Sequence, residues 1–192
     1  LYQIHSATFD SGVLDNHAVL GEMAEFKDSG AHVGLTLSGP RQASILQRAR
    51  EITFGGAPLF ETVQATFNLF ETSAAPALQD ASEGGMGVII KEGLANGRLT
   101  SRNHAPAFGE RLEVLREESE RLGVTPSQLA LAYVLHQPWA DLVLSGAART
   151  DHLQSNLAAL DIELDARARG RLSGLAFDPE TYWSLRDEFG WG

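Results

Sequence analysis

One residue that could do chemistry stands at the end of the chain's first apolar run. Leu1 to Ile4 have the composition of a buried β-strand, and His5 follows them directly. In parallel α/β proteins, active sites lie at the carboxyl ends of strands, and a neutral imidazole there can donate a hydrogen bond to a carbonyl oxygen. The alternative is a buried histidine whose ring is satisfied by its neighbours. The position makes His5 a candidate catalytic residue.

A second candidate site lies where a later strand turns into a helix. The turn contains Gly146, and the helix begins near Thr150, with this threonine or the aspartate after it as the predicted cap. The free N–H groups and positive dipole end of such a helix attract a phosphate. Arg149 and His152 lie at this end and Asn156 one turn further. The alternative is a capped surface helix with solvated charges.

The composition gives no indication of metal or thiol chemistry. The chain has no cysteine, which excludes a disulfide scaffold, a thiolate zinc site and a cysteine nucleophile. No serine lies in a nucleophile-elbow pattern. Four further histidines show no metal-ligand spacing with each other or with nearby acids; they are His17, His32, His104 and His136. We therefore predict no metal site.

Five short segments must position the candidate residues. They are apolar on both faces rather than alternating, which predicts a parallel sheet covered by helices. The predicted strands are Leu1–His5, Val33–Leu37, Val63–Phe67, Val88–Ile90 and Leu142–Leu144. Helical patterns lie between them, one starting near Pro40 and another at a capping box that begins with Thr125. Repeated βα units predict one α/β domain over residues 1–192.

Two α/β architectures fit these units. A doubly wound sheet should carry a glycine-rich phosphate turn after its first strand, but His5-Ser6-Ala7-Thr8 has none. The other architecture is a (β/α)8 barrel, typically of about 250 residues, of which five units are represented here.

Five stretches, in order and at suitable intervals, resemble the last five barrel strands of an aldo-keto reductase. They are LYQIHS, VGLTLSGP, VQATFNL, GVIIKEGLANGRLT and SGAARTDHLQSNLAAL. The closing YWSLRDEFGW is similar to the carboxyl-terminal tail of a bacterial branch of that family. The resemblance implies a TIM barrel, represented here by strands four to eight with their helices.

The same resemblance implies an NADPH-dependent reductase of aldehydes or ketones, with NADH not excluded. The family's catalytic tetrad is Asp, Tyr, Lys and His, and only the histidine, which orients the substrate, lies in the matched part. It falls on His5. The other three belong to strands one to three, which this sequence lacks, so we expect little or no activity from the 192 residues alone.

The resemblance also implies positions for the cofactor. Thr36 and Gln64 are similar to the polar residues that hold the nicotinamide carboxamide, although Thr36-Leu37 stands where the family usually has Ser-Asn. Gln64 has the alternative of a hydrogen bond inside the barrel. Lys91 stands where many members place an aromatic ring on the nicotinamide; its stem can cover a ring and its ammonium can approach a phosphate.

Two loops complete this predicted cofactor site. Leu94 and Gly97 lie in the loop 93–100, which resembles the family's pyrophosphate belt, and its glycines let backbone approach a ligand. His152 stands near the position of an arginine that contacts the 2′-phosphate, with Arg149 available to compensate, and Asn156 matches a residue that contacts adenine. In the tail, Tyr182, Trp183 and Trp191 either line the substrate mouth or cover a barrel edge.

Charge and hydropathy limit the partners. The net charge is −10, which disfavours nucleic acid and anionic lipid, and no apolar run is long enough to span a membrane. We expect a soluble cytoplasmic protein whose partners are a small-molecule carbonyl substrate and either the amino-terminal part of the same barrel or a second chain. Two alternatives stay open: a non-catalytic NADPH-binding or partner-binding barrel fragment that serves as a regulatory subunit, and an unrelated five-stranded domain.

Overall fold

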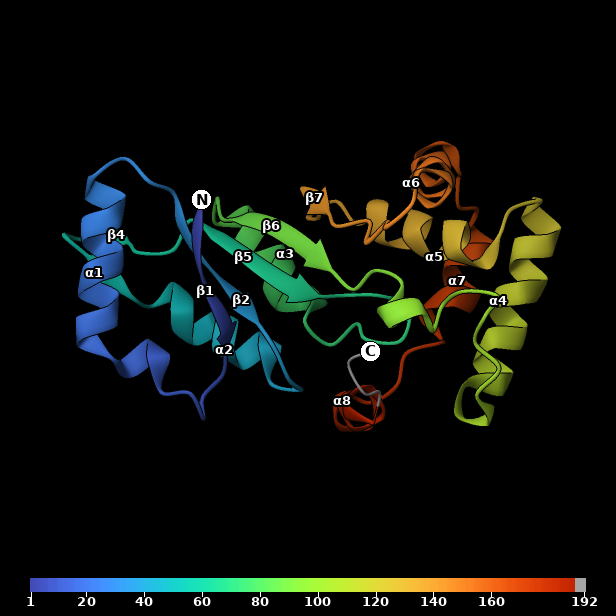
Figure 1. Cartoon of the computed structure of the whole chain (residues 1–192), viewed down its shortest axis with the longest axis horizontal. Coiled ribbons are helices and arrows are strands. Elements are labelled where there is room, and N and C mark those ends of the chain that lie inside the picture. Colours follow the sequence, from blue (N-terminus) through green and yellow to red (C-terminus); the bar gives the residue numbers. More distant parts are fainter. Residues whose placement is uncertain (189–192) are drawn as a thin grey trace.

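The computed structural model describes residues 1–188 and contains a sheet of five parallel strands (Figure 1). In spatial order the strands are β1 (Tyr2–Ala7), β2 (Val33–Leu37), β5 (Thr62–Thr66), β6 (Gly87–Lys91) and β7 (Leu142–Val143). Each strand pairs in parallel with the next of these along the chain, because helical connections of crossover length separate them. The predicted five parallel strands are confirmed.

The helices form two groups along the chain. The first group is α1 (His17–Asp28), α2 (Gln42–Arg50) and α3 (Ala75–Glu83). The second group is α4 (Gly109–Leu122), α5 (Pro126–Leu135), α6 (Thr150–Leu157), α7 (Ala166–Ser173) and α8 (Pro179–Asp187). Short 3-10 turns are η1 (Val13–Asp15), η2 (Ala95–Gly97), η3 (Pro106–Phe108) and η4 (Ala158–Asp161). Within residues 1–188, no helix is both long enough and apolar enough to cross a membrane.

The helix starts show which sequence signals were correct. Thr125 caps α5, and its capping box with Gln128 is present as predicted. The prediction for α6 is wrong in detail, because Thr150 is already the first helical residue and the cap position is Arg149, whose side chain makes no capping hydrogen bond. The helix therefore starts without the capping side chain that Thr150 or Asp151 was expected to supply.

A small antiparallel hairpin between α2 and β5 was not predicted. Its strands are β3 (Thr53–Phe54) and β4 (Ala57–Pro58). The two residues between them, Gly55 and Gly56, have φ angles of 59° and 83°. Tight hairpin turns of this kind need left-handed backbone at both positions, which glycine adopts without a steric cost. The Gly-Gly pair was the signal for this hairpin in the sequence.

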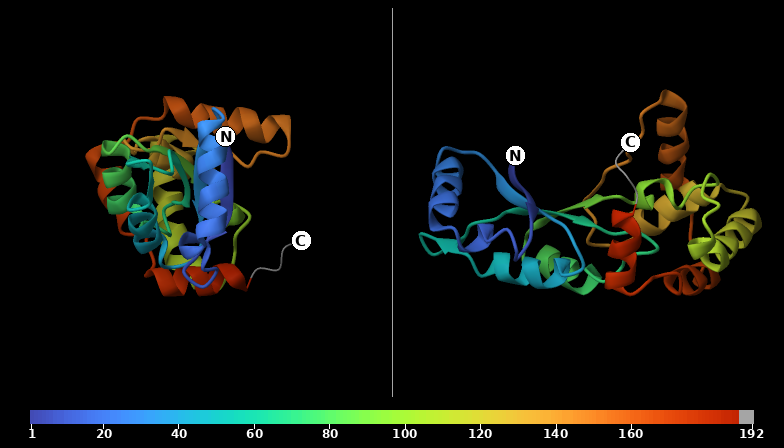
Figure 2. Two further views of the ribbon diagram at one scale, coloured as in Figure 1. Left: turned by 90° about the vertical axis from the view of Figure 1, so that its left-hand side faces the viewer. Right: turned by 60° about the horizontal axis from the view of Figure 1, so that its bottom comes forward.

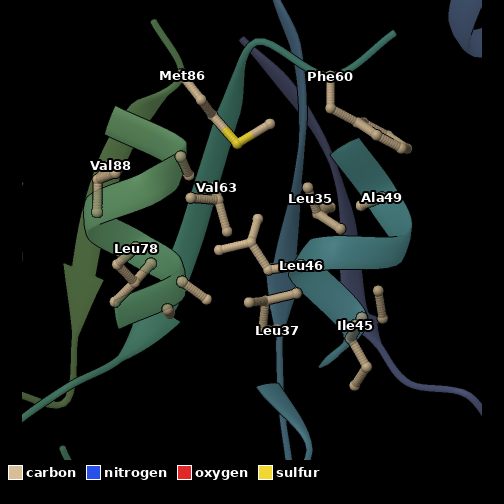
Figure 3. Packing of buried hydrophobic residues seen from close by; sticks show 14 of the residues in the cluster. Leu35, Leu37, Ile45, Leu46, Ala49, Phe60, Val63, Leu78, Met86 and Val88 are labelled. Atoms are coloured by element: carbon tan, nitrogen blue, oxygen red, sulfur yellow. The ribbon is translucent and has the colours of Figure 1, made fainter. Parts of the chain in front are cut away.

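One face of the sheet is covered by helices. Leu35, Val63 and Val88 point from the strands into a fully buried cluster. Figure 3 shows these side chains against Leu46 of α2 and Leu78 of α3, which are also fully buried. In the right-hand view of Figure 2, α2 and α3 lie beneath the sheet. Burial of this apolar face is the main stabilising contribution to the amino-terminal half of the chain.

The opposite face of the sheet is less completely buried. β2 is buried at every position, as predicted for a strand buried on both faces, but the other four strands are not, which corrects the prediction for them. Burial alternates along β5 and β6, and Gln64 and Lys91 are half-buried. The outer segments are more exposed still, with Leu1 65% and Leu142 49% exposed. The physical reason is that the second face carries no helix layer among residues 1–188 (Figure 2). A sheet covered on one side alternates in burial.

A second hydrophobic cluster joins the carboxyl-terminal helices. The rings of Phe70 and Phe108 lie with centroids 5.3 Å apart within it. Tyr182 and Trp183 of α8 belong to the same cluster and are only 0% and 4% exposed. They cover the end of the sheet rather than line an open substrate mouth, so that alternative is wrong for both. Trp191 lies outside the described residues.

Candidate functional site

An open cleft of about 810 Å³ lies at the carboxyl ends of β6 and β7. Its walls are the loop that follows β6, and the turn and helix α6 that follow β7. The volume is in the range of small-molecule sites. Six predicted cofactor residues lie on these walls: Lys91, Leu94, Gly97, Gly146, His152 and Asn156. Two segments far apart in the sequence thus form one site.

Two glycines keep the backbone of this cleft open. Gly97 has a φ of 88° and Gly146 a φ of 61°, and a Cβ added to either would meet nothing within 4 Å. Both positions therefore need glycine for their turn and leave room for a ligand. Gly93 differs, because its added Cβ would lie 3.2 Å from Leu131 in the core. Gly93 itself lies on the wall of the cleft, so its small size serves packing against the core and leaves its approach to a ligand a prediction.

The cleft is locally basic although the chain carries a net charge of −10. Lys91, Arg98 and Arg102 lie on its walls together with His152. Among the described residues of these walls, the one acidic side chain is Glu92, and it is engaged by an arginine of α8. The local field therefore favours an anionic ligand.

Lys91 is the ionisable group of the cleft whose surroundings matter most. Its side chain is half-buried at the carboxyl end of β6. Burial lowers the pKa of its ammonium below the usual value, Glu92 opposes this shift, and Arg186 adds to it. Within residues 1–188 no carboxylate forms an ion pair with the Lys91 ammonium. A ligand anion can take that place.

The amino terminus of α6 differs from the expected phosphate site. Arg149 does not line the cleft and instead forms an ion pair with Asp151, with N···O distances of 2.9 and 3.1 Å. This hydrogen bond from Arg149, with the backbone N–H groups of Asp151 and His152, lowers the pKa of the Asp151 carboxyl. A carboxylate of the chain therefore already engages donors that were expected to meet a phosphate.

The side of α6 that carries His152 and Asn156 lines the cleft. Asn156 Nδ2 donates to the backbone oxygen of Ser145 at 3.0 Å, which holds the helix against the end of β7. His152 lies on the wall near this contact. Both residues were predicted from the sequence. Arg102, Ser145 and other polar residues of the walls were not, because isolated serines and arginines in loops carry no distinctive spacing.

The other predicted site residues lie outside the cleft and form a row across the sheet. Ile4 packs into the helix-covered core, so His5, the next residue, points to the opposite face. Thr36 pairs with Gln64 in the ladder between β2 and β5 and lies on that face as well. His5 is exposed, Thr36 is buried and Gln64 is half-buried. Lys91 lies beyond this row, because it pairs with Thr66, two residues after Gln64 on β5.

Thr36 also shapes the strand end that carries the histidine. Its Oγ1 accepts a hydrogen bond of 2.7 Å from the N–H of Ser6. The register between β1 and β2 shifts here, and Ser6 has a φ of 51°, which marks a bulge beside His5. Gln64 Nε2 lies 3.5 Å from Gln3 Oε1, so its alternative of a hydrogen bond on the inner face is present.

A buried polar network beneath the cleft was missed in the sequence. Asn68 Nδ2 donates at 3.0 Å both to the backbone oxygen of Glu92 and to Tyr182 Oη. Burial is the main cause that raises the pKa of the Tyr182 phenol. No group of three or more His, Cys, Asp or Glu side chains in residues 1–188 is placed to hold a metal. Because Glu92 lies on the wall of the cleft, the hydrogen bond from Asn68 supports that wall.

Comparison with known proteins decides the family. Residues 1–176 match the model of the aldo/keto reductase family. The chain belongs to this family. The alternative of an unrelated five-stranded domain is therefore wrong.

The relatives of this aldo-keto reductase chain are distant in sequence. Uncharacterized oxidoreductases of Mycobacterium tuberculosis (Rv2298) and Mycobacterium bovis (Mb2320) are each 26% identical to it over 196 residues, a match that includes 92% of this chain and 58% of the relative. The chain thus spans little more than half the length of these relatives.

Solved aldo-keto reductases share the fold. The holo form of AKR11C1 from Bacillus halodurans matches 92% of this chain and 58% of its own, with 21% identity and a TM-score of 0.69. The thermostable Tm1743, in complex with the inhibitor epalrestat, matches 91% of this chain and 58% of its own, with 21% identity and a TM-score of 0.66. The parallel sheet and its helices are those of an aldo-keto reductase barrel, as the sequence predicted.

Proposed function

We propose that the chain carries the NADP(H) site and the substrate-orienting histidine of an oxidoreductase that reduces aldehydes or ketones. Family membership supports the reaction class, and relatives named as oxidoreductases agree with it. The observation that carries the proposal is the basic cleft, where six residues predicted from two separate segments come together.

The residues of the cleft fit a dinucleotide with several phosphates. Gly97 and Gly146 leave open space beside the backbone for a diphosphate. The ammonium of Lys91 offers a cation that forms no ion pair with a carboxylate of residues 1–188, and His152 and Asn156 lie together for the adenosine end. When bound, the dinucleotide would supply the hydride for carbonyl reduction.

His5 has the proposed role of holding the substrate carbonyl. A neutral imidazole donates a hydrogen bond to the carbonyl oxygen and stabilises the negative charge that develops on it. The proton donor has no counterpart on the strands matched here. We therefore propose that the active protein places further strands beside β1, from the same barrel or from a second chain; the exposed outer side of β1 supports this.

The test is a fluorescence titration of the purified protein with NADPH and, separately, NADH. We expect NADPH to bind more tightly, and Lys91→Met to weaken NADPH binding about tenfold, because one charged hydrogen bond to phosphate is lost. Lys27→Met is the matched control. Lys27 is the chain's other lysine, and its ammonium donates to the oxygen of Pro58 at 2.8 Å, far from the cleft in sequence.

Two results would contradict the proposal. Absence of NADPH binding by the folded protein would exclude the cofactor, and equal losses for Lys91→Met and Lys27→Met would exclude the cleft as its site. NADPH binding without aldehyde-dependent NADPH oxidation, even in a protein with a closed barrel, would favour the non-catalytic alternative.

A further inference from the structure

A partly buried ion pair joins helix α8 to the cleft. The Arg186 guanidinium of α8 holds the Glu92 carboxylate in two contacts, Nη2 to Oε1 at 2.7 Å and Nε to Oε2 at 3.1 Å. Both side chains are only 11% exposed. A two-point contact of this kind fixes direction as well as distance.

The backbone of Glu92 is also held in a fixed position. Its φ of 57° is left-handed, which ends the alternation of β6 directly after Lys91. The backbone oxygen of Glu92 accepts a hydrogen bond from buried Asn68 at 3.0 Å. Asn68, in the loop after β5, thus fixes the backbone of Glu92, and Arg186 of α8 fixes its side chain.

This arrangement affects Lys91, the neighbour of Glu92 in sequence, because it determines which groups can pair with the Lys91 ammonium. Glu92 is the carboxylate best placed to pair with this ammonium, but Arg186 already occupies both its oxygens. The chain's other lysine has partners, because Lys27 lies 3.7 Å from Glu61 and donates to a backbone oxygen. Of the two lysines, the one on the wall of the cleft lacks an ion pair with any described residue.

We propose that Arg186 is a positioning residue that, by engaging Glu92, keeps the ammonium of Lys91 available to an anionic ligand in the cleft. The carboxyl-terminal helix thereby acts on ligand binding without contacting the ligand. The proposal rests on the proposed function only for the identity of that ligand, since the arrangement of the three side chains exists without it.

The test measures how fast each lysine reacts with acetic anhydride, by peptide mass spectrometry of the full protein without ligand. Arg186→Met keeps the aliphatic stem and releases Glu92, which should turn to Lys91 and protect its amine. We expect the rate at Lys91 to fall about threefold or more, because a neighbouring carboxylate raises the pKa of an amine, while the rate at Lys27 is unchanged. A merely structural role predicts the opposite, a faster reaction as α8 loosens.

Three further variants keep the proposal falsifiable if Arg186→Met disturbs folding. Glu92→Gln should make Lys91 react faster, because the carboxylate is gone and the Arg186 cation stays. Arg186→Lys should keep the rate at Lys91 near that of the natural protein. The double variant Arg186→Met with Glu92→Gln should restore the rate lost in Arg186→Met. An unchanged or slower rate in Glu92→Gln, or no recovery in the double variant, would overturn the proposal.

A second arm separates this proposal from the assignment of the cofactor. In the natural protein, inorganic pyrophosphate should slow acetylation of Lys91 and leave Lys27 unaffected, and Arg186→Met should weaken this protection. Protection by pyrophosphate but not by NADPH would leave the positioning role in place and contradict the NADP(H) assignment. Absence of protection by either anion would overturn the role of Lys91 as an anion site.

Discussion

His5 and Lys91 are held in different ways, and each needs its own test. His5 lies just before a bulge at Ser6, whose geometry is held by the Ser6 N–H to Thr36 Oγ1 hydrogen bond. Its ring is exposed on the face of the sheet that lacks helices. Lys91 is half-buried and lines the cleft. A residue outside the cleft should affect the reaction more than the binding of the dinucleotide.

In the catalytically complete enzyme, we expect His5→Ala to lower kcat by about 10²- to 10⁴-fold, the usual contribution of a positioned acid or hydrogen-bond donor. The dissociation constant for NADPH should change by less than about twofold, because His5 does not line the cleft. Steady-state kinetics and fluorescence titration measure the two quantities. His17→Ala, at an exposed position, is the control. Comparable losses in both quantities would refute the assignment.

Among the helices, a buried carboxylate of α4 forms ion pairs with arginines of α7. Glu118 of α4 is fully buried and accepts hydrogen bonds from Arg121 at 2.7 Å, Arg167 at 3.2 Å and Arg171 at 2.6 Å. Burial alone would raise the pKa of its carboxyl, but the hydrogen bonds from Arg171 and Arg121 outweigh this and lower it. The charged form is therefore the one that stabilises the folded state.

Glu118→Gln should lower the free energy of unfolding at neutral pH by about 1–3 kcal/mol, since three arginines lose their common charged acceptor. A depressed folded-state pKa contributes stability above the unfolded pKa of about 4.3, and this contribution is lost as the pH falls further. The difference between the two proteins should thus shrink below about pH 4. Urea denaturation at several pH values measures it.

The control is Glu113→Gln, which removes an exposed partner of Arg116 on the same helix. Its cost should stay within about 0.5 kcal/mol, as for other surface ion pairs. Equal costs for the two variants, or a Glu118→Gln cost that does not depend on pH, would show that Glu118 is not acting through its charge.

At the scale of the whole molecule, the outer edge of β1 is the feature with the largest consequence. The backbone N–H of Tyr2 donates to the backbone oxygen of His32 at 2.8 Å. Because alternate residues of a parallel strand bond to opposite sides, the N–H and C=O groups of Gln3 point away from β2. No described residue pairs with that edge, since β1 is the first strand of the sheet order. Such an edge pairs readily with another strand.

A protein consisting of residues 1–192 should therefore self-associate as its concentration rises, in light-scattering measurements. Gln3→Pro should weaken this association with little loss of thermal stability, because proline is tolerated on edge strands and the backbone N–H that it removes points outward. The side-chain hydrogen bonds lost with Gln3, to Gln64 and Thr62, are long, at 3.5 and 3.4 Å. Ile4→Pro is the matched contrast, since Ile4 lies in the ladder with Leu35 and packs into the core. Self-association unaffected by Gln3→Pro would exclude β1 as the contact.

Part of this fold and site could be predicted because the signals are local. The strands follow from short apolar runs, the start of α5 from the capping box at Thr125, and the open turns at Gly97 and Gly146 from glycines after strands. The errors have a common cause. Burial of both sheet faces and the expected exposure of Tyr182 and Trp183 at a substrate mouth depend on what lies across from each residue, and periodicity does not report that.

By itself, the sequence determined the order of strands and helices and several helix ends, because hydrophobic period, caps and turn residues act within a few positions. The family and the two segments that form the cleft followed from the resemblance of five stretches to aldo-keto reductases. Only the tertiary structure decided that Tyr182 is buried and that Glu92 belongs to Arg186, its partner 94 positions away, rather than to adjacent Lys91. The energy of a buried ion pair depends on burial and on the direction of both groups, which exist only once the chain has folded.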